Sequence, residues 1–143
     1  MTIYLAARYS RRLELVAYRT QLQEAGHEVT SRWLNGEHES LDADWTQIPR
    51  EQVAEWAEQD LEDIDEADVV IVFTEAQPVG RRRGGYHVET GFALAQEKLL
   101  AIVGPRENTF HCLDEVEVFQ IFEECLAWLE EIEEDTTELE DES

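Results

Sequence analysis

Two carboxyl groups in this sequence have surroundings that suit proton transfer and nucleophilic attack. Asp60 lies four residues after Trp56 and four before Ile64, so a helix would place it within their apolar stripe. A carboxyl group held against apolar neighbours has a raised pKa, which a general acid needs near neutral pH. The alternative is a solvated Asp60 at the edge of the stripe, beside Asp63.

Glu89 is the second candidate, and it follows the glycine pair Gly84-Gly85. We expect a helix to begin near Tyr86, which would place Glu89 in its first turn. The positive end of the helix dipole favours an ionised carboxylate there, so we expect Glu89 to stay charged and available as a nucleophile or ligand. Glutamate is also common in a first helical turn as a capping residue, and this alternative stays open.

An ionised glutamate and a protonated aspartate in one crevice would match the two roles needed in retaining glycoside chemistry. One carboxylate attacks the sugar carbon while the other carboxyl group protonates the leaving group. Tyr4 lies in the first predicted strand, from which its hydroxyl group could bond to Glu89 and hold its rotamer. A core tyrosine with a satisfied hydroxyl group explains Tyr4 equally well, and spacing does not choose between the two.

Six of the eleven basic residues fall in two short segments. Arg8, Arg11 and Arg12 follow the first predicted strand, and residues 81–83 are all arginine. On a chain with a formal net charge of −23, this clustering indicates a local site for a small anion, most simply a phosphate. Ser10, which we expect to cap the next helix, belongs to the same candidate site. Alternatively, the arginines balance neighbouring acids or hold an oligomer together.

The elements that must position these residues alternate between strand and helix. Strands are predicted over residues 2–7, 27–33, 67–74, 99–103 and 116–119, and helices over 10–25, 49–64, 86–97 and 121–131. This alternation predicts right-handed crossovers and a parallel sheet covered by helices on both faces. We expect a flavodoxin- or Rossmann-like three-layer α/β sandwich with five strands in the order 2-1-3-4-5. Ligands in such folds bind beyond the carboxyl ends of the strands, near the switch in strand order.

Composition limits the classes of partner. Acidic residues outnumber basic ones 34 to 11, which opposes a nucleic-acid polymer or an anionic membrane as the main partner. No apolar stretch is long enough to span a bilayer, and the two cysteines lack metal-site spacing, so we expect a cytoplasmic protein. We predict one domain over residues 1–129 and a disordered acidic tail over 130–143.

Four short motifs between Ile3 and Lys98 occur together in this sequence. They are Ile3-Tyr4, Asp60 eight residues before Asp68 in Ala67-Asp68-Val69-Val70, Gly85-x-x-x-Glu89-x-Gly91, and Ala93-Leu94-Ala95. In combination they resemble the nucleoside 2-deoxyribosyltransferase family and its relatives, the nucleoside 5′-monophosphate N-glycosidases. No single motif is specific, but the Glu-x-Gly step together with the upstream aspartate is.

The resemblance implies roles for the candidate residues. Glu89 would be the nucleophile that forms a covalent glycosyl-enzyme, Asp60 the acid that protonates the departing base, and Tyr4 the residue that orients Glu89. The position six before the nucleophile contacts the 5′ side of the sugar in the family. Here it is Arg83, which fits a 5′-phosphate and fits a free hydroxyl group poorly.

The expected reaction is therefore cleavage or transfer of the N-glycosidic bond of a (deoxy)nucleoside 5′-monophosphate by double displacement. It needs no cofactor and no metal, and its partner is a small nucleotide. The alternatives are a glycohydrolase of a larger nucleotide such as NAD, and a nucleotide sensor that binds without turnover.

Four further positions belong to the expected substrate site. Gly85 would let the backbone approach the ligand. His87 stands where the family usually has glycine, so it narrows the pocket or adds a titratable group. Trp33 could stack on the base and His38 could bond to it, although a Trp33 buried in the core is the alternative.

The resemblance also implies an assembly. Family members often complete their site with a neighbouring subunit, so we expect a homodimer or a higher homo-oligomer. Residues 104–111 are a candidate for the segment that reaches across.

Overall fold

The sheet is parallel and has the expected strand order. The computed structural model describes residues 1–36, 45–76 and 84–142. Its strands are β1 (Thr2–Ala6), β2 (Glu28–Val29), β3 (Val69–Phe73), β4 (Leu99–Val103) and β5 (Val116–Phe119). They pair in the order β2-β1-β3-β4-β5, with every pair parallel. The predicted α/β sandwich and its topology are confirmed.

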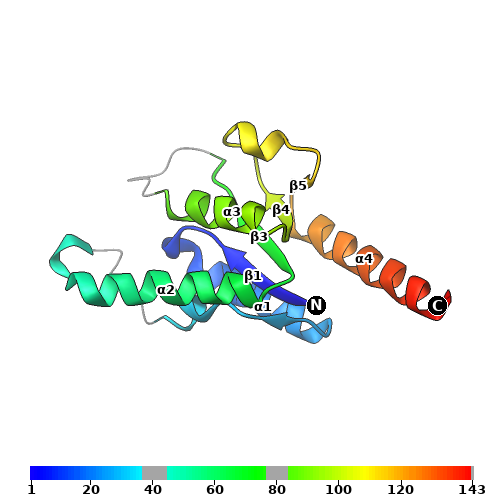
Figure 1. The fold of residues 1–143 in the computed structure, drawn as a ribbon, viewed down its shortest axis with the longest axis horizontal. Coiled ribbons are helices and arrows are strands. Elements are labelled where there is room, and N and C mark those ends of the chain that lie inside the picture. Colours follow the sequence, from blue (N-terminus) through cyan, green and yellow to red (C-terminus); the bar gives the residue numbers. More distant parts are fainter. Residues whose placement is uncertain (37–44, 77–83, 143) are drawn as a thin grey trace.

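Helices cover both faces of this sheet. The helices are α1 (Arg12–Glu24), α2 (Arg50–Glu66), α3 (Gly85–Ala95) and α4 (Phe122–Glu142). Helices α2 and α3 run beside each other on one face (Figure 1). On the other face α1 meets the start of α4, where the rings of Tyr18 and Phe122 stack with centroids 4.3 Å apart. The three layers place the core around β1, β3 and β4.

The central strand β3 shows why the chain folds in this way. All five of its residues, from Val69 to Phe73, are fully buried, as expected for a strand covered on both faces. Period-two alternation along β1 turns Tyr4 towards the face that α2 and α3 cover. Burial of the β1 and β3 side chains removes their apolar surface from water, and this drives the assembly of the layers.

The predicted start of the first helix is wrong. Ser10 does not cap α1: it lies exposed in a short 3₁₀ helix, Tyr9–Arg11, and α1 begins at Arg12 with no side-chain cap. The inner face of α1 is formed by Leu15 and Leu22, whereas Leu13 is 74% exposed. Because the 3₁₀ turn precedes it, α1 starts at Arg12 and not at the predicted residue 10.

The second strand is shorter than predicted. It ends at Val29, and the chain then forms a 3₁₀ helix, η2 (Arg32–Asn35). The side chain of Asp63 in α2 accepts hydrogen bonds from both the backbone N–H and Nε of Arg32, at 2.9 and 2.8 Å. These contacts from another layer turn the chain away from the sheet, and no local sequence pattern reports them.

The last helix is longer than predicted. Helix α4 runs to Glu142, through the acidic stretch for which we expected disorder. The domain boundary at residue 129 stays a prediction. Among the helices in the described ranges, none is both long and apolar enough to cross a membrane.

Gly104, directly after β4, provides a test of how closely the loops pack at the carboxyl edge of the sheet. Its φ is +123°, and an added Cβ would collide with Thr74 Oγ1 and lie 3.1 Å from the Thr74 carbonyl oxygen. We predict that Gly104→Ala lowers the free energy of unfolding by about 1–3 kcal/mol, measured by urea denaturation.

Gly91→Ala is the matched control, because a Cβ there meets nothing within 4 Å and the residue lies inside α3. It should leave stability unchanged or raise it by about 0.5–1 kcal/mol. Equal effects of the two substitutions would show that the close packing at Gly104 is unimportant.

Candidate active site

A partly buried hydrogen bond joins the first strand to the third helix. The hydroxyl group of Tyr4 donates to Glu89 Oε2, and the two residues are 85 positions apart in the sequence. Tyr4 has no exposed surface. Burial, followed by the nearby charge of Glu89, raises the pKa of Tyr4 well above its usual value, so the phenol remains a donor. The bond leaves Glu89 Oε1 as the oxygen that a ligand can meet.

Glu89 lies in the second turn of α3, and this corrects the prediction about its charge. The helix begins at Gly85 with Gly84 as its N-cap, and its first turn contains no acidic residue. Because the dipole acts mainly on the first turn, it is weak at Glu89. Burial, followed by the charge of Asp60, raises the pKa of Glu89 to about 8, although the Tyr4 bond opposes the shift. The capping alternative also fails, because the carboxylate bonds to Tyr4.

Asp60 faces the same region from α2, as its place in the apolar stripe predicts. Burial raises its pKa to about 7, with a further contribution from the charge of Asp63 and an opposing one from Arg32. Its Oδ1 is buried and has no hydrogen-bond partner among the residues that the structure describes. The solvated alternative for Asp60 is therefore wrong.

The two carboxyl groups act on one another through space. The charge of Asp60 raises the pKa values of both Glu89 and Tyr4. Like charges in a poorly hydrated site do not both ionise readily, so the pair retains a proton near neutral pH. One carboxylate and one carboxylic acid in contact with the same ligand could support nucleophilic attack and general acid catalysis.

The aspartate next to the stripe has a structural role. Asp63 is 3% exposed and pairs with Arg32, which also bonds to Glu62 at 2.9 Å. This pairing anchors η2, so that the indole N–H of Trp33 donates to the carbonyl oxygen of Leu5 at 2.8 Å. Trp33 is only 5% exposed. Trp33 is therefore a buried core residue, which was the alternative to stacking on the base, and little of its ring face is left for a base.

The arginines that follow β1 are partly engaged within the chain. Arg11 pairs with Glu14 at 2.7 Å and lies 3.7 Å from Glu75, as the charge-balance alternative predicts. Arg12 donates to the carbonyl oxygen of Leu34 at 3.0 Å and so holds η2. Arg8 lies partly exposed beyond the carboxyl end of β1. The other members of the expected anion site, Arg81 to Arg83, and also His38, lie outside the described residues.

Glu107 is a residue of this edge that the sequence analysis missed. Its carboxylate accepts a hydrogen bond from the Glu75 N–H at 2.8 Å and a shared one from the Tyr86 hydroxyl group, whose oxygen lies 2.8 Å from both Oε1 and Oε2. Its Oε2 also lies 3.2 Å from His87 Nε2. One side chain from the segment after β4 thus joins the end of β3 to the first turn of α3. The expectation that residues 104–111 reach away to another subunit does not apply to Glu107, which binds its own chain.

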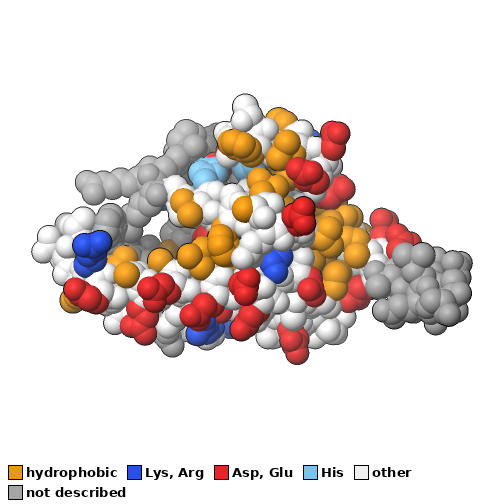
Figure 2. All heavy atoms as spheres, in the orientation of Figure 1, with side chains coloured by type: hydrophobic (Ala, Val, Ile, Leu, Met, Phe, Trp, Pro, Cys, Tyr) orange, Lys and Arg blue, Asp and Glu red, His pale blue; other side chains and the backbone are white. Residues whose placement is uncertain are grey.

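The same network sets the tautomer of His87. Asn108 Oδ1 accepts the backbone N–H groups of Phe110 and His111, so its Nδ2 donates to His87 Nδ1 at 3.3 Å. His87 Nε2 therefore carries the proton and donates to Glu107. Both ring nitrogens of His87 are used within the protein, and Figure 2 shows histidine side chains at the surface between α3 and the segment after β4.

Gly85, which we expected to let the backbone approach the ligand, has open space around it. A Cβ at Gly85 would meet nothing within 4 Å, so only a bound ligand would require glycine there.

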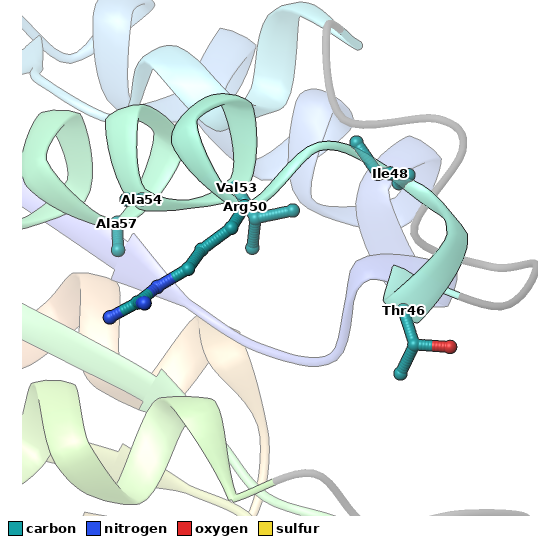
Figure 3. A pocket seen from close by; sticks show the side chains of 6 residues that line it. All are labelled: Thr46, Ile48, Arg50, Val53, Ala54 and Ala57. Atoms are coloured by element: carbon teal, nitrogen blue, oxygen red, sulfur yellow. The ribbon is translucent and has the colours of Figure 1, made fainter.

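A hollow of about 440 Å³ lies under the amino-terminal half of α2 (Figure 3). It is lined by Thr46, Ile48, Arg50, Val53, Ala54 and Ala57. Ala57 and Val53 precede Asp60 by three and seven residues, which places all three on one face of the helix. The sequence analysis did not find this hollow, because its shape depends on how the chain before α2 folds back.

Comparisons with known proteins support the fold. No family model and no curated protein matches the sequence. Among solved structures, the chain is similar to the CMP N-glycosidase BcmB of Clostridium botulinum, with a TM-score of 0.55 and 21% sequence identity. The match covers 91% of this chain and 98% of that one. At this identity, the likeness establishes a shared α/β fold.

The buried carboxyl group of Asp60 should reduce stability as the pH rises towards neutral. A carboxyl group whose pKa is raised from 3.8 to about 7 holds its proton more tightly in the folded chain, so stability falls as pH rises through that range. We predict that Asp60→Asn lacks this loss and becomes more stable than the wild type between about pH 5 and pH 7.

The measurement is urea denaturation of both proteins across this range. Glu58→Gln is the control, because Glu58 is an exposed acid on the same helix. It should follow the wild type at every pH. A constant difference between Asp60→Asn and the wild type would contradict the raised pKa.

Proposed function

We propose that this protein cleaves or transfers the N-glycosidic bond of a (deoxy)nucleoside 5′-monophosphate through a covalent glycosyl-Glu89 intermediate. The observation that carries the proposal is the arrangement of Tyr4, Glu89 and Asp60 on the face of the sheet that α2 and α3 cover. One carboxyl group is held by a buried phenol, and the other has an unpartnered buried oxygen. The fold shared with a CMP N-glycosidase supports the same class of reaction.

In the first step, Glu89 Oε1 attacks the anomeric carbon of the sugar. The N-glycosidic bond breaks, its electron pair moves to the base nitrogen, and Asp60 donates its proton to the base. Tyr4 keeps its hydrogen bond to Oε2, which holds the carboxylate in one rotamer and reduces the entropy lost in reaching the transition state. The products are the glycosyl ester of Glu89, a neutral base and the Asp60 carboxylate.

In the second step, an acceptor replaces Glu89 at the anomeric carbon. When the acceptor is water, the Asp60 carboxylate removes its proton as the new C–O bond forms and the ester bond to Glu89 breaks. When the acceptor is a second base, its ring N–H proton goes to Asp60 in the same way. Both routes restore the starting pair with one proton on Asp60 and none on Glu89.

The raised pKa values suit this cycle. Turnover needs one proton on the pair, and mutual repulsion of the two carboxylates makes the singly protonated state favourable near neutral pH. The hydrogen bond from Tyr4 favours the charged form of Glu89 but only partly offsets its burial, so the pKa of Glu89, about 8, stays above that of Asp60, about 7. In the free protein the shared proton therefore favours Glu89, and turnover uses the form in which it has moved to Asp60. We assign Asp60 as the acid because its buried Oδ1 has no partner among the described residues, and Glu89 as the nucleophile because Tyr4 holds its carboxylate.

We assign the 5′-phosphate to Arg8 and Arg83. Arg8 follows β1 at the edge of the sheet where the ligand would lie, and it is partly exposed there. Ser10 is exposed in the same turn, and the backbone of Gly85 opens α3, whose free N–H groups favour an anion. His87 lies in the first turn of the same helix.

Glu89→Gln tests the reaction directly. We predict that it abolishes base release, by at least about a thousandfold, because glutamine cannot form the glycosyl ester. Base release is measured on ribo- and deoxyribonucleoside monophosphates, the matching nucleosides and NAD, with a free base added to half of the samples.

The outcomes of this panel separate the candidate functions. Release that needs the 5′-phosphate supports the hydrolase, and base exchange moves the assignment to a transferase. Nicotinamide release would favour the NAD glycohydrolase, and nucleotide binding without any release would favour a sensor. Glu97→Gln, an exposed acid just after α3, is the control and should keep full activity.

Asp60→Asn tests the acid. We predict a bell-shaped dependence of kcat/KM on pH in the wild type, because Asp60 must be protonated and Glu89 ionised. The variant should lose the alkaline limb, and its acidic limb should move to lower pH, since the charge of Asp60 no longer raises the pKa of Glu89. Bases that leave poorly should lose the most rate. An equal loss for all bases, with an unchanged pH profile, would contradict the role of Asp60.

A further inference from the structure

The hollow under α2 begins at Ala57, about one helical turn from the acid of the proposed reaction. Ile64, Asp60, Ala57 and Val53 form one row along the helix, at intervals of four, three and four residues. Ile64 is fully buried in the core, Asp60 is partly exposed, and Ala57 and Val53 line the hollow. Along this row, the filled core lies on the Ile64 side of Asp60, and the hollow lies on the Ala57 side.

This arrangement determines where a leaving base would extend. If Asp60 protonates the base, the base lies against Asp60, while the sugar lies at Glu89 and Tyr4. The filled core at Ile64 excludes the base from that side. The remaining direction along α2 leads to Ala57, which is about 4.5 Å from Asp60 along the helix axis, and then to Val53, about 10 Å away.

The walls of the hollow have a clear chemical character. Ile48, Val53, Ala54 and Ala57 provide apolar surface suited to a flat ring or an alkyl group. Arg50 provides a positive charge, and its side chain extends from the first turn of α2 beneath the helix in the direction of Ala57 (Figure 3). In the part of the chain that the structure describes, no hydrogen bond or ion pair engages the Arg50 guanidinium.

The size of the hollow indicates more than an unsubstituted base. Its volume of about 440 Å³ falls within the range of about 300–1,000 Å³ typical of small-molecule sites. A single ring against Asp60 would reach Ala57, but the space continues by a further turn of helix to Val53. A group attached to the outer edge of the base would fill that space and meet Arg50.

We propose that this hollow is the subsite for the leaving base, and that it selects a base whose edge remote from the sugar carries a carboxylate substituent. The carboxylate forms a bidentate pair with Arg50, and the ring packs on Ala57 and Val53. The inference rests on the proposed function, because it takes the acid Asp60 as the group that contacts the base.

The test compares three cytidine 5′-monophosphates that differ only at C5, where they carry hydrogen, a methyl group or a carboxylate. Base release is measured as kcat/KM, and binding is measured separately by thermal shift of the inactive Glu89→Gln protein. We expect the carboxylate to be favoured over the methyl group by roughly fivefold or more in both measurements. Arg50→Gln should abolish this preference, and Arg19→Gln, on the opposite face of the sheet, should preserve it.

Val53→Trp provides a second variant that fills the hollow without changing charge. It should reduce the discrimination among the three nucleotides. A ranking that Arg50→Gln and Val53→Trp both leave unchanged would overturn the subsite. So would a change of oligomeric state in Val53→Trp with the ranking intact, because the hollow would then belong to a contact between two copies of the chain.

The two proposals fail in different ways. Equal base release from all three nucleotides overturns the subsite and leaves the reaction standing. No release from any of them, with the carboxylate nucleotide still binding best to Glu89→Gln, overturns the reaction and supports the subsite as a binding site.

Discussion

The hydrogen bond from Tyr4 to Glu89 is the interaction on which the candidate site depends. It connects a side chain of the innermost part of the sheet to a helix in the outer layer. Tyr4 is held by burial on all sides, so it has one available rotamer and presents its hydroxyl group at one position. Glu89 is consequently fixed as well, and the geometry of the site follows from this bond between β1 and α3, with α3 packed on β3 and β4.

The site carries an electrostatic cost that the rest of the domain offsets. Two carboxyl groups share a poorly hydrated region, and both have raised pKa values. Such an arrangement destabilises the folded state as pH rises, and proteins retain it mainly where it serves chemistry. The buried strands β1, β3 and β4 supply the apolar burial that tolerates this cost, while Asp63, paired with Arg32, supports the wall beside Asp60.

Glu107 joins the end of β3 to the first turn of α3, and its carboxylate differs from that of Asp60 in its surroundings. Glu107 is almost completely surrounded by donors: a backbone N–H, a phenol and an imidazole. Its charge is thereby satisfied, in contrast to Asp60, whose buried oxygen has no partner among the described residues. The contrast separates a carboxylate that holds elements together from one that remains available for proton transfer.

Local patterns in the sequence determined the elements and one half of the site. The alternation of apolar runs and helical stripes predicted the strand order, and the spacing of Trp56, Asp60 and Ile64 predicted a carboxyl group with a raised pKa. Both signals are short-range, because strand burial and helix periodicity are properties of neighbouring residues. Resemblance to a known family supplied the roles of Glu89 and Tyr4, and these roles remain proposals.

Only the tertiary structure decided the remainder. The charge of Glu89 depends on burial beneath another layer and on Asp60, so an argument from the dipole of its own helix gave the wrong sign. The end of β2, the tautomer of His87 and the partners of Glu107 depend on contacts between distant segments. Their energies come from desolvation and hydrogen bonding across layers, and these terms exist only once the chain has folded.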